Sequence, residues 1–236
     1  MKILIICCSK KYYQALIIFN WLIKCTTLLP SYFIQRAHIY GSLTEFAKSI
    51  EDIKAAILMD PDNAGYYANL GGYLVSNEVL KHEKITKICS KKVLEEAMKD
   101  YYTALEKDPV NECAWINLIE VCIFTNRWDD AVCYFASCKS FIKSMSSQLI
   151  RSFLGSIALI LCGDEINKAD MKILNDFSIS ISYFDYRLSE TDSFLTELER
   201  SGFDGVRINK LKEIFILFIA HYIDDPYRYG PWAHSI

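Results

Sequence analysis

The residues of this sequence that are best suited to acid–base chemistry stand close to its end. His221 follows the apolar run Ile214–Ala220 and precedes Asp224 and Asp225. A histidine with a carboxylate to orient it and a nucleophile within reach can act as a general base. The sequence has no nucleophile-elbow, zinc-protease or phosphate-loop motif beside this cluster, and a histidine at the end of an apolar helix is typically a C-terminal cap. We therefore predict no catalytic residues, and a small helical enzyme with a site around His221 and Asp224 remains an alternative.

The nine cysteines are the other residues that could do chemistry, as metal ligands or nucleophiles. Their odd number and their scatter along the chain do not form a disulfide framework, which favours a reducing compartment and a cytoplasmic location. Cys133 and Cys138, with Cys122 nearby, suggest zinc, but the helical register described below turns Cys133 away from the other two, and metal ligands must converge. Gly202-x2-Gly205 is typical of a turn. We predict no metal and no cofactor.

Length and composition exclude several classes of protein. The chain has 236 residues, 52% of them apolar, which suffices for the core of one large domain or two small ones. It carries 26 Lys and Arg against 29 Asp and Glu, so it lacks the basic field of a general nucleic-acid binder. Nine glycines and five prolines are too few for a linker or a disordered chain. A mean hydropathy of +0.12 favours a protein that buries much of its surface or docks on a partner.

The beginning of the chain is apolar but does not match a signal or membrane-spanning segment. The run Met1–Cys8 is too short for the core of a signal sequence. Tyr12–Leu29 approaches the length of a membrane span but contains Gln14, Asn20 and Lys24. We do not expect membrane contact, although a membrane-peripheral assembly factor that uses Tyr12–Leu29 remains a further alternative.

An internal repeat organises the chain. Pro61 and Pro109 end two similar segments and stand 48 residues apart, whereas Phe33 and Tyr67 are separated by 34 residues. A period of 34 residues with one 14-residue insertion near residues 75–93 accounts for both offsets.

The repeat resembles the tetratricopeptide repeat family, whose unit is a helix–turn–helix of about 34 residues. The best-formed repeat supplies the expected aromatic, small and proline positions: Tyr67, Leu70, Gly71, Ala97, Tyr101, Ala104 and Pro109. Arg36, where leucine is usual, and Ile119, where a small residue is usual, depart from the pattern. The resemblance covers roughly residues 11–142. It implies an all-α, right-handed solenoid with one elongated repeat and a helical C-terminal cap.

The repeat register divides the chain into three parts. Residues 1–29 are expected to form a truncated leading repeat, in which Tyr12–Lys24 is the second helix and Met1–Cys8 is a fragment of the first helix or a strand-like arm. Residues 30–145 hold three repeats. Residues 146–236 form a helical cap and an aromatic tail that closes the end of the solenoid.

The resemblance also implies a binding face, because the first helix of each pair lines the concave side of such a solenoid. The candidate groove residues are Gln35, His38, Asn69, Gly72, Asn117 and Glu120. Asn69 and Asn117 occupy equivalent positions, and a side-chain amide there can pair with the backbone of an extended peptide or merely bridge neighbouring helices. The lysine and arginine clamp that some members use to hold a C-terminal carboxylate is missing.

The insertion is expected to lengthen two helices, Tyr66–Lys81 and Lys84–Lys107, because 14 residues are nearly four helical turns. It is locally basic, and its lysines are Lys81, Lys84, Lys87, Lys91 and Lys92. They form either a solvated helix tip or a basic protrusion that contacts an acidic partner or a membrane surface.

The sequence therefore predicts a cytoplasmic protein-interaction scaffold or adaptor. Its partner is expected to be a protein or peptide segment held in the concave groove, without nucleic acid. The oligomeric state, the role of residues 146–236 and the place of the aromatic tail stay open at this point.

Overall fold

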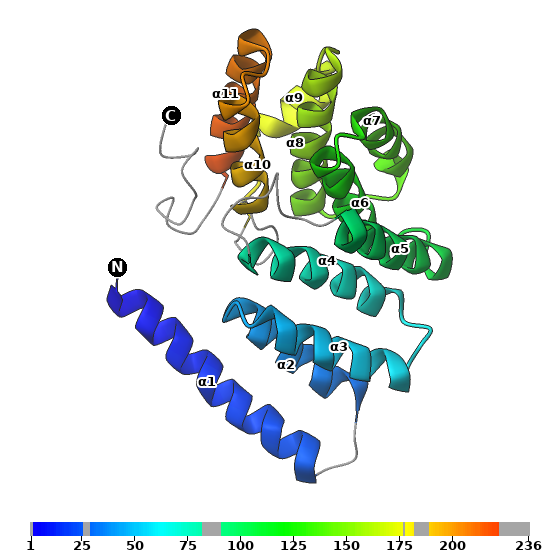
Figure 1. Ribbon diagram of the computed structural model, residues 1–236, viewed down its shortest axis with the longest axis vertical. Helices are drawn as coiled ribbons and strands as arrows, with labels where there is room; N and C mark the ends of the chain where they lie inside the picture. Colours follow the sequence, from blue (N-terminus) through cyan, green and yellow to red (C-terminus); the bar gives the residue numbers. More distant parts are fainter. Residues whose placement is uncertain (1, 26–28, 82–90, 177, 182–188, 222–236) are drawn as a thin grey trace.

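The computed structural model describes the chain except for residues 1, 26–28, 82–90, 177, 182–188 and 222–236. The described residues form α-helices joined by short turns (Figure 1). In chain order the helices are α1 (Lys2–Cys25), α2 (Pro30–Ser42), α3 (Phe46–Met59), α4 (Ala64–Lys81), α5 (Lys91–Lys107), α6 (Glu112–Phe124), α7 (Trp128–Ser137), α8 (Met145–Cys162), α9 (Lys168–Leu174), α10 (Ser189–Arg200) and α11 (Gly205–Ile219). A 3-10 turn, Cys138–Ser140, follows α7.

The helices pack as consecutive pairs in a row. The pairs α2–α3, α4–α5, α6–α7 and α8–α9 are each in contact, α4 contacts α6, and α6 contacts α8. Helix α1 packs against α2 at one end of the row, and α10 and α11 lie toward the other end (Figure 1). The prediction of an all-α solenoid of helix pairs is confirmed.

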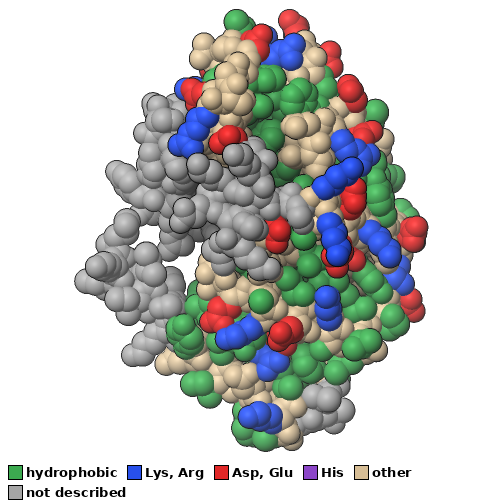
Figure 2. Space-filling model, viewed as in Figure 1, with side chains coloured by type: hydrophobic (Ala, Val, Ile, Leu, Met, Phe, Trp, Pro, Cys, Tyr) green, Lys and Arg blue, Asp and Glu red, His purple; other side chains and the backbone are tan. Residues whose placement is uncertain are grey.

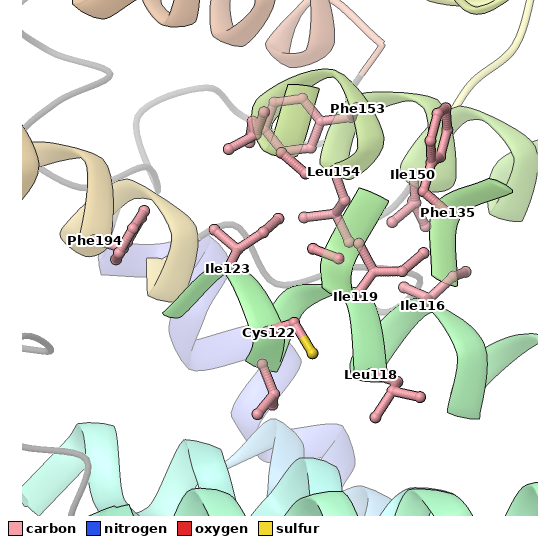
Figure 3. Close-up of a cluster of buried hydrophobic side chains, with 14 of the residues drawn as sticks. Ile116, Leu118, Ile119, Cys122, Ile123, Phe135, Ile150, Phe153, Leu154 and Phe194 are labelled. Carbon is pink, nitrogen blue, oxygen red and sulfur yellow. The ribbon is translucent and has the colours of Figure 1, made fainter. Parts of the chain in front are cut away.

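The largest cluster of buried hydrophobic side chains among the described residues extends from Val75 in α4 to Phe218 in α11. Figure 3 shows Ile119 of α6, Phe135 of α7, Leu154 of α8 and Phe194 of α10 in this cluster. Helix α8 is its centre, and it is the one described helix long and apolar enough to cross a membrane. Because 67% of that helix is buried inside the protein, its hydropathy is explained by packing in the core.

Two aromatic side chains pack directly onto glycines of neighbouring helices. A Cβ atom on Gly71 of α4 would lie 2.5 Å from Cε1 of Tyr101 in α5. A Cβ atom on Gly155 of α8 would lie 2.1 Å from Cδ2 of Phe135 in α7. The close helix approach that marks the predicted repeats therefore continues past residue 142, at α8.

The helices on the two sides of the insertion are longer than the helices of the neighbouring repeats. Helix α4 has 18 residues and α5 has 17, whereas α2, α3, α6 and α7 have 13, 14, 13 and 10. The predicted helix Lys84–Lys107 begins among residues 82–90, which lie outside the described residues.

The leading segment differs from the prediction. Lys2–Cys25 is one continuous helix of 24 residues, so the interpretation of Met1–Cys8 as a fragment of a separate helix or a strand-like arm is wrong. The sequence between Cys8 and Tyr12 contains no glycine or proline to end the helix. Helical structure therefore propagates through Ser9 and the two lysines that follow it.

Arg36, the residue that replaces the usual leucine, joins α1, α2 and α3. Its Nε and Nη2 atoms donate to the two carboxylate oxygens of Asp52, at 2.8 and 2.6 Å, and its Nη1 donates to Oδ1 of Asn20 at 2.7 Å. The Asp52 carboxylate, which is almost fully buried, raises the pKa of Arg36 through this hydrogen bonding. The departure from the repeat pattern thus has a structural role, because it fastens α1 to the first pair.

Arg36→Leu is expected to lower the free energy of unfolding by about 3 kcal/mol, because it leaves the Asp52 carboxylate buried without a partner. The double variant Arg36→Leu with Asp52→Leu should recover most of that loss. Urea denaturation of the two variants measures both values. A double variant as unstable as the single one would contradict the ion-pair explanation.

Gly155→Ala is expected to destabilise the protein by about 1–3 kcal/mol, because Phe135 must move away from the new methyl group. The matched control is Gly205→Ala, where a Cβ atom would meet nothing within 4 Å. Alanine favours helix over glycine, so the control should be neutral or stabilising. Thermal unfolding followed by circular dichroism distinguishes the two, and equal effects would contradict the close approach at Gly155.

Candidate functional site

The first helices of successive pairs lie side by side, which brings most of the predicted groove residues together. A Cβ atom on Gly41 of α2 would lie 2.5 Å from the ring of Tyr73 in α4. One on Gly72 of α4 would lie 3.6 Å from Nδ2 of Asn117 in α6. We call the resulting line across α2, α4 and α6 the inner row, and its members are His38, Asn69, Gly72, Asn117 and Glu120. Gln35 is exposed on α2, one turn before His38.

At the α2 end of the inner row, Nδ2 of Asn69 lies 3.4 Å from Nε2 of His38. Desolvation lowers the pKa of His38, which favours the neutral ring, and the unprotonated nitrogen of a neutral ring can accept from the amide. Asn69 therefore partly serves to bridge two helices, which is one of the two roles expected for it.

In the middle of the inner row, Asn117 differs from its equivalent Asn69. Its side chain is half-buried and makes no hydrogen bond with the described residues, and it sits beside the position where Gly72 has no side chain. An amide offers two donors and an acceptor that can pair with a backbone amide group. Within the part of the chain that the structure describes, the Asn117 amide therefore has unused hydrogen-bonding groups.

The α6 end of the inner row is covered by the protein itself. Oγ1 of Thr191 in α10 donates to Oε1 of Glu120 at 3.2 Å. One turn further along α6, the ring of Phe124 lies 5.5 Å from that of Phe194. Helix α10, which belongs to the predicted cap, therefore limits the row at Glu120. Thr191 went unrecognised in the sequence, because nothing in the spacing of the repeat links positions 71 residues apart.

The basic protrusion is not part of this row. Lys91 and Lys92 are exposed at the start of α5, where Nζ of Lys91 lies 3.7 Å from Oε1 of Glu95. Lys81 ends α4, and Lys84 and Lys87 lie outside the described residues. A half-open hollow of about 550 Å³ separates the beginning of α5 from the α6–α7 turn, and Lys91 is among its lining residues.

His221 has a structural environment. Its side chain is 3% exposed, with Nδ1 2.8 Å from the carbonyl oxygen of Ile179 and Nε2 2.8 Å from that of Leu174. Both ring nitrogens therefore lie within hydrogen-bonding distance of backbone carbonyl oxygens. Asp224 lies outside the described residues, so the acid–base pair of the enzyme alternative is untested. Among the residues that the structure describes, no group of His, Cys, Asp and Glu could hold a metal ion.

His221→Leu is expected to lower the free energy of unfolding by about 2–3 kcal/mol, since a buried carbonyl group loses its hydrogen-bond donor and the buried ring is replaced by a side chain of another shape. His38→Leu is the matched control, because His38 is exposed and makes a single long contact. It should change stability by less than about 0.5 kcal/mol. Chemical denaturation of both variants tests this, and similar losses would contradict a structural role specific to His221.

No protein-family model and no curated protein matches this sequence. Among solved structures, the chain is similar to a thermophilic TPR protein of Thermus thermophilus, with 15% sequence identity and a TM-score of 0.54. The superposition covers 90% of this chain and 95% of that chain, so it extends well beyond the repeats visible in the sequence. Together with the row of helix pairs, this similarity shows that the chain has the fold of a tetratricopeptide repeat protein.

Proposed function

We propose that this protein is a non-enzymatic interaction scaffold that holds an extended segment of a partner protein along the inner row. The observation that carries this proposal is the position of the Asn117 amide next to Gly72, where it has no hydrogen-bond partner among the described residues. A backbone can approach closely where a glycine lacks a side chain, and the amide can then pair with a peptide group as donor and acceptor. His38 and Asn69 extend the same polar line toward α2.

The charge of the inner row indicates what kind of segment it takes. Glu120 is its one charged member, and that carboxylate already accepts a hydrogen bond from Thr191. Desolvation lowers the pKa of His38 and so favours its uncharged form. Recognition therefore depends on neutral hydrogen bonds and packing, which favours an uncharged partner segment and an affinity that changes little with salt.

A cytoplasmic location belongs to the same proposal. Several cysteines of the described residues are free thiols, namely Cys25, Cys113, Cys122, Cys133 and Cys138. Free thiols persist where the compartment is reducing.

The proposal is tested with a library of random linear peptides displayed on phage and selected on the full chain. The peptides selected on the wild type are then titrated, by fluorescence anisotropy, with the wild type and with the double variant Asn69→Ala, Asn117→Ala. Each lost amide contact is worth about 1 kcal/mol, so the double variant should bind about tenfold to thirtyfold more weakly. The melting temperature should barely change.

Asn209→Ala is the control, because Asn209 is an exposed asparagine on α11, far along the chain from the inner row. It should leave peptide affinity unchanged. Peptides that bind the double variant as tightly as the wild type would contradict the inner-row proposal, as would a selection that yields no binding peptide.

A further inference from the structure

Helix α1 is fixed to the protein through one face. Leu16 is buried there, and the ring of Phe19 lies 6.5 Å from that of Tyr32 in α2. Asn20, on the same face, accepts the hydrogen bond from Arg36. Helix α1 lies at the end of the row and packs mainly against α2, with few contacts to other described helices (Figure 1).

The opposite face of α1 presents large apolar side chains to solvent. Tyr13, Ile17, Ile18 and Trp21 are between 54% and 69% exposed. Figure 2 shows hydrophobic side chains at the lower end of the molecule, where α1 lies in Figure 1. This face of α1 therefore carries a mainly apolar stripe of the kind that marks a docking surface.

Lysines flank the centre of the apolar stripe. At 100° per residue, Lys11 and Lys24 stand about 140° apart around the helix, and Ile17, Trp21 and Ile18 fall between them. Exposed Gln14 lies among these three, and Tyr13 lies about 20° beyond Lys24. Both lysines are exposed. An apolar strip that contains tryptophan and is edged by lysines is the pattern of a helix lying in the plane of a membrane interface.

The charge of this end of the chain points to the same kind of surface. Residues 1–44 contain five Lys and Arg and no Asp or Glu, whereas residues 45–236 carry a net charge of −8. Two copies of α1 laid face to face would bring their lysines together, which disfavours self-association through this stripe. An anionic lipid surface supplies both the apolar medium and the opposite charge, at about 1 kcal/mol for each lysine near it.

We propose that α1 docks its Tyr13–Trp21 stripe on the surface of an anionic phospholipid membrane, with its axis parallel to the bilayer. The helix does not need to leave the protein to do so, because its other face stays on α2. The inner row lies on other helices, α2, α4 and α6, so it remains open to a partner. The membrane proposal does not depend on peptide binding to the inner row, and it would still hold if no peptide bound there.

The experiment is flotation of the full chain with phosphatidylcholine–phosphatidylserine vesicles and, in parallel, with pure phosphatidylcholine vesicles. The wild type should float with the anionic vesicles and lose most of that binding when salt is raised. Ile17→Glu should bind at least about tenfold more weakly, because it places a carboxylate in the apolar stripe. Lys11→Gln with Lys24→Gln should bind about twenty-fivefold more weakly, or about fivefold for each lysine.

The controls are substitutions of the same type at matched exposed sites. Val206 on α11 is as exposed as Ile17, at 69%, so Val206→Glu introduces the same charge at the other end of the molecule. Lys139→Gln with Lys210→Gln removes two exposed lysines elsewhere. Both controls should bind vesicles like the wild type, and thermal melts check that every variant is folded.

Trp21 provides a direct readout of insertion. Its fluorescence should shift to shorter wavelength with anionic vesicles, and the shift should disappear in Trp21→Phe. Equal binding of Ile17→Glu and Val206→Glu would overturn the proposal, as would no binding by the wild type. A wild-type dimer that Ile17→Glu dissociates, without any vesicle binding, would assign the stripe to self-association instead.

Discussion

The arrangement of the whole chain depends on how closely its helices can approach one another. At Gly71 and at Gly155 an aromatic ring, Tyr101 or Phe135, occupies the space that a side chain would need. The contact at Gly71 joins the two helices of one pair, and the contact at Gly155 joins one pair to the next. In both kinds of contact, the distance between the helices is therefore set by an aromatic ring that packs on a glycine. The spacing of the inner row follows from it, since Asn117 can lie beside Gly72 only if α4 and α6 are also close.

Two arginines fix the parts of the structure that the repeat pattern does not. Arg36 joins α1 to the first pair through Asp52. Arg151 in α8 donates to the carbonyl oxygen of Phe135 at 2.8 and 3.1 Å and to Asp170 at 3.1 Å, and it is almost completely buried. Apolar packing tolerates small shifts between helices, whereas a buried guanidinium needs all its partners in place. These arginines therefore determine the register of α1 and α9.

Periodicity explains what could be predicted from the sequence and what could not. The 34-residue and 48-residue offsets located α2–α7, because aromatic and small residues recur there at fixed spacing. The offsets did not predict α9, because a helix of seven residues is too short to contain the repeat's spacing of aromatic and small residues. They also gave no sign that Thr191 reaches Glu120 or that His221 reaches the carbonyl of Leu174, 47 residues earlier. Contacts of that kind depend on where the cap packs, and no local signal encodes it.

The distribution of charge separates the two proposed surfaces by their physics. The formal net charge of −3 is not evenly distributed. Helix α1 is basic and apolar, whereas the inner row on α2, α4 and α6 has Glu120 as its one charged member. Screening by salt acts on the attraction between lysines and lipid headgroups over about 10 Å, but it hardly affects hydrogen bonds between neutral amides. Ionic strength therefore changes the first interaction and not the second. Because the apolar stripe lies on α1 and the inner row lies on α2, α4 and α6, the two proposed interactions use different side chains and can be disrupted separately by substitution.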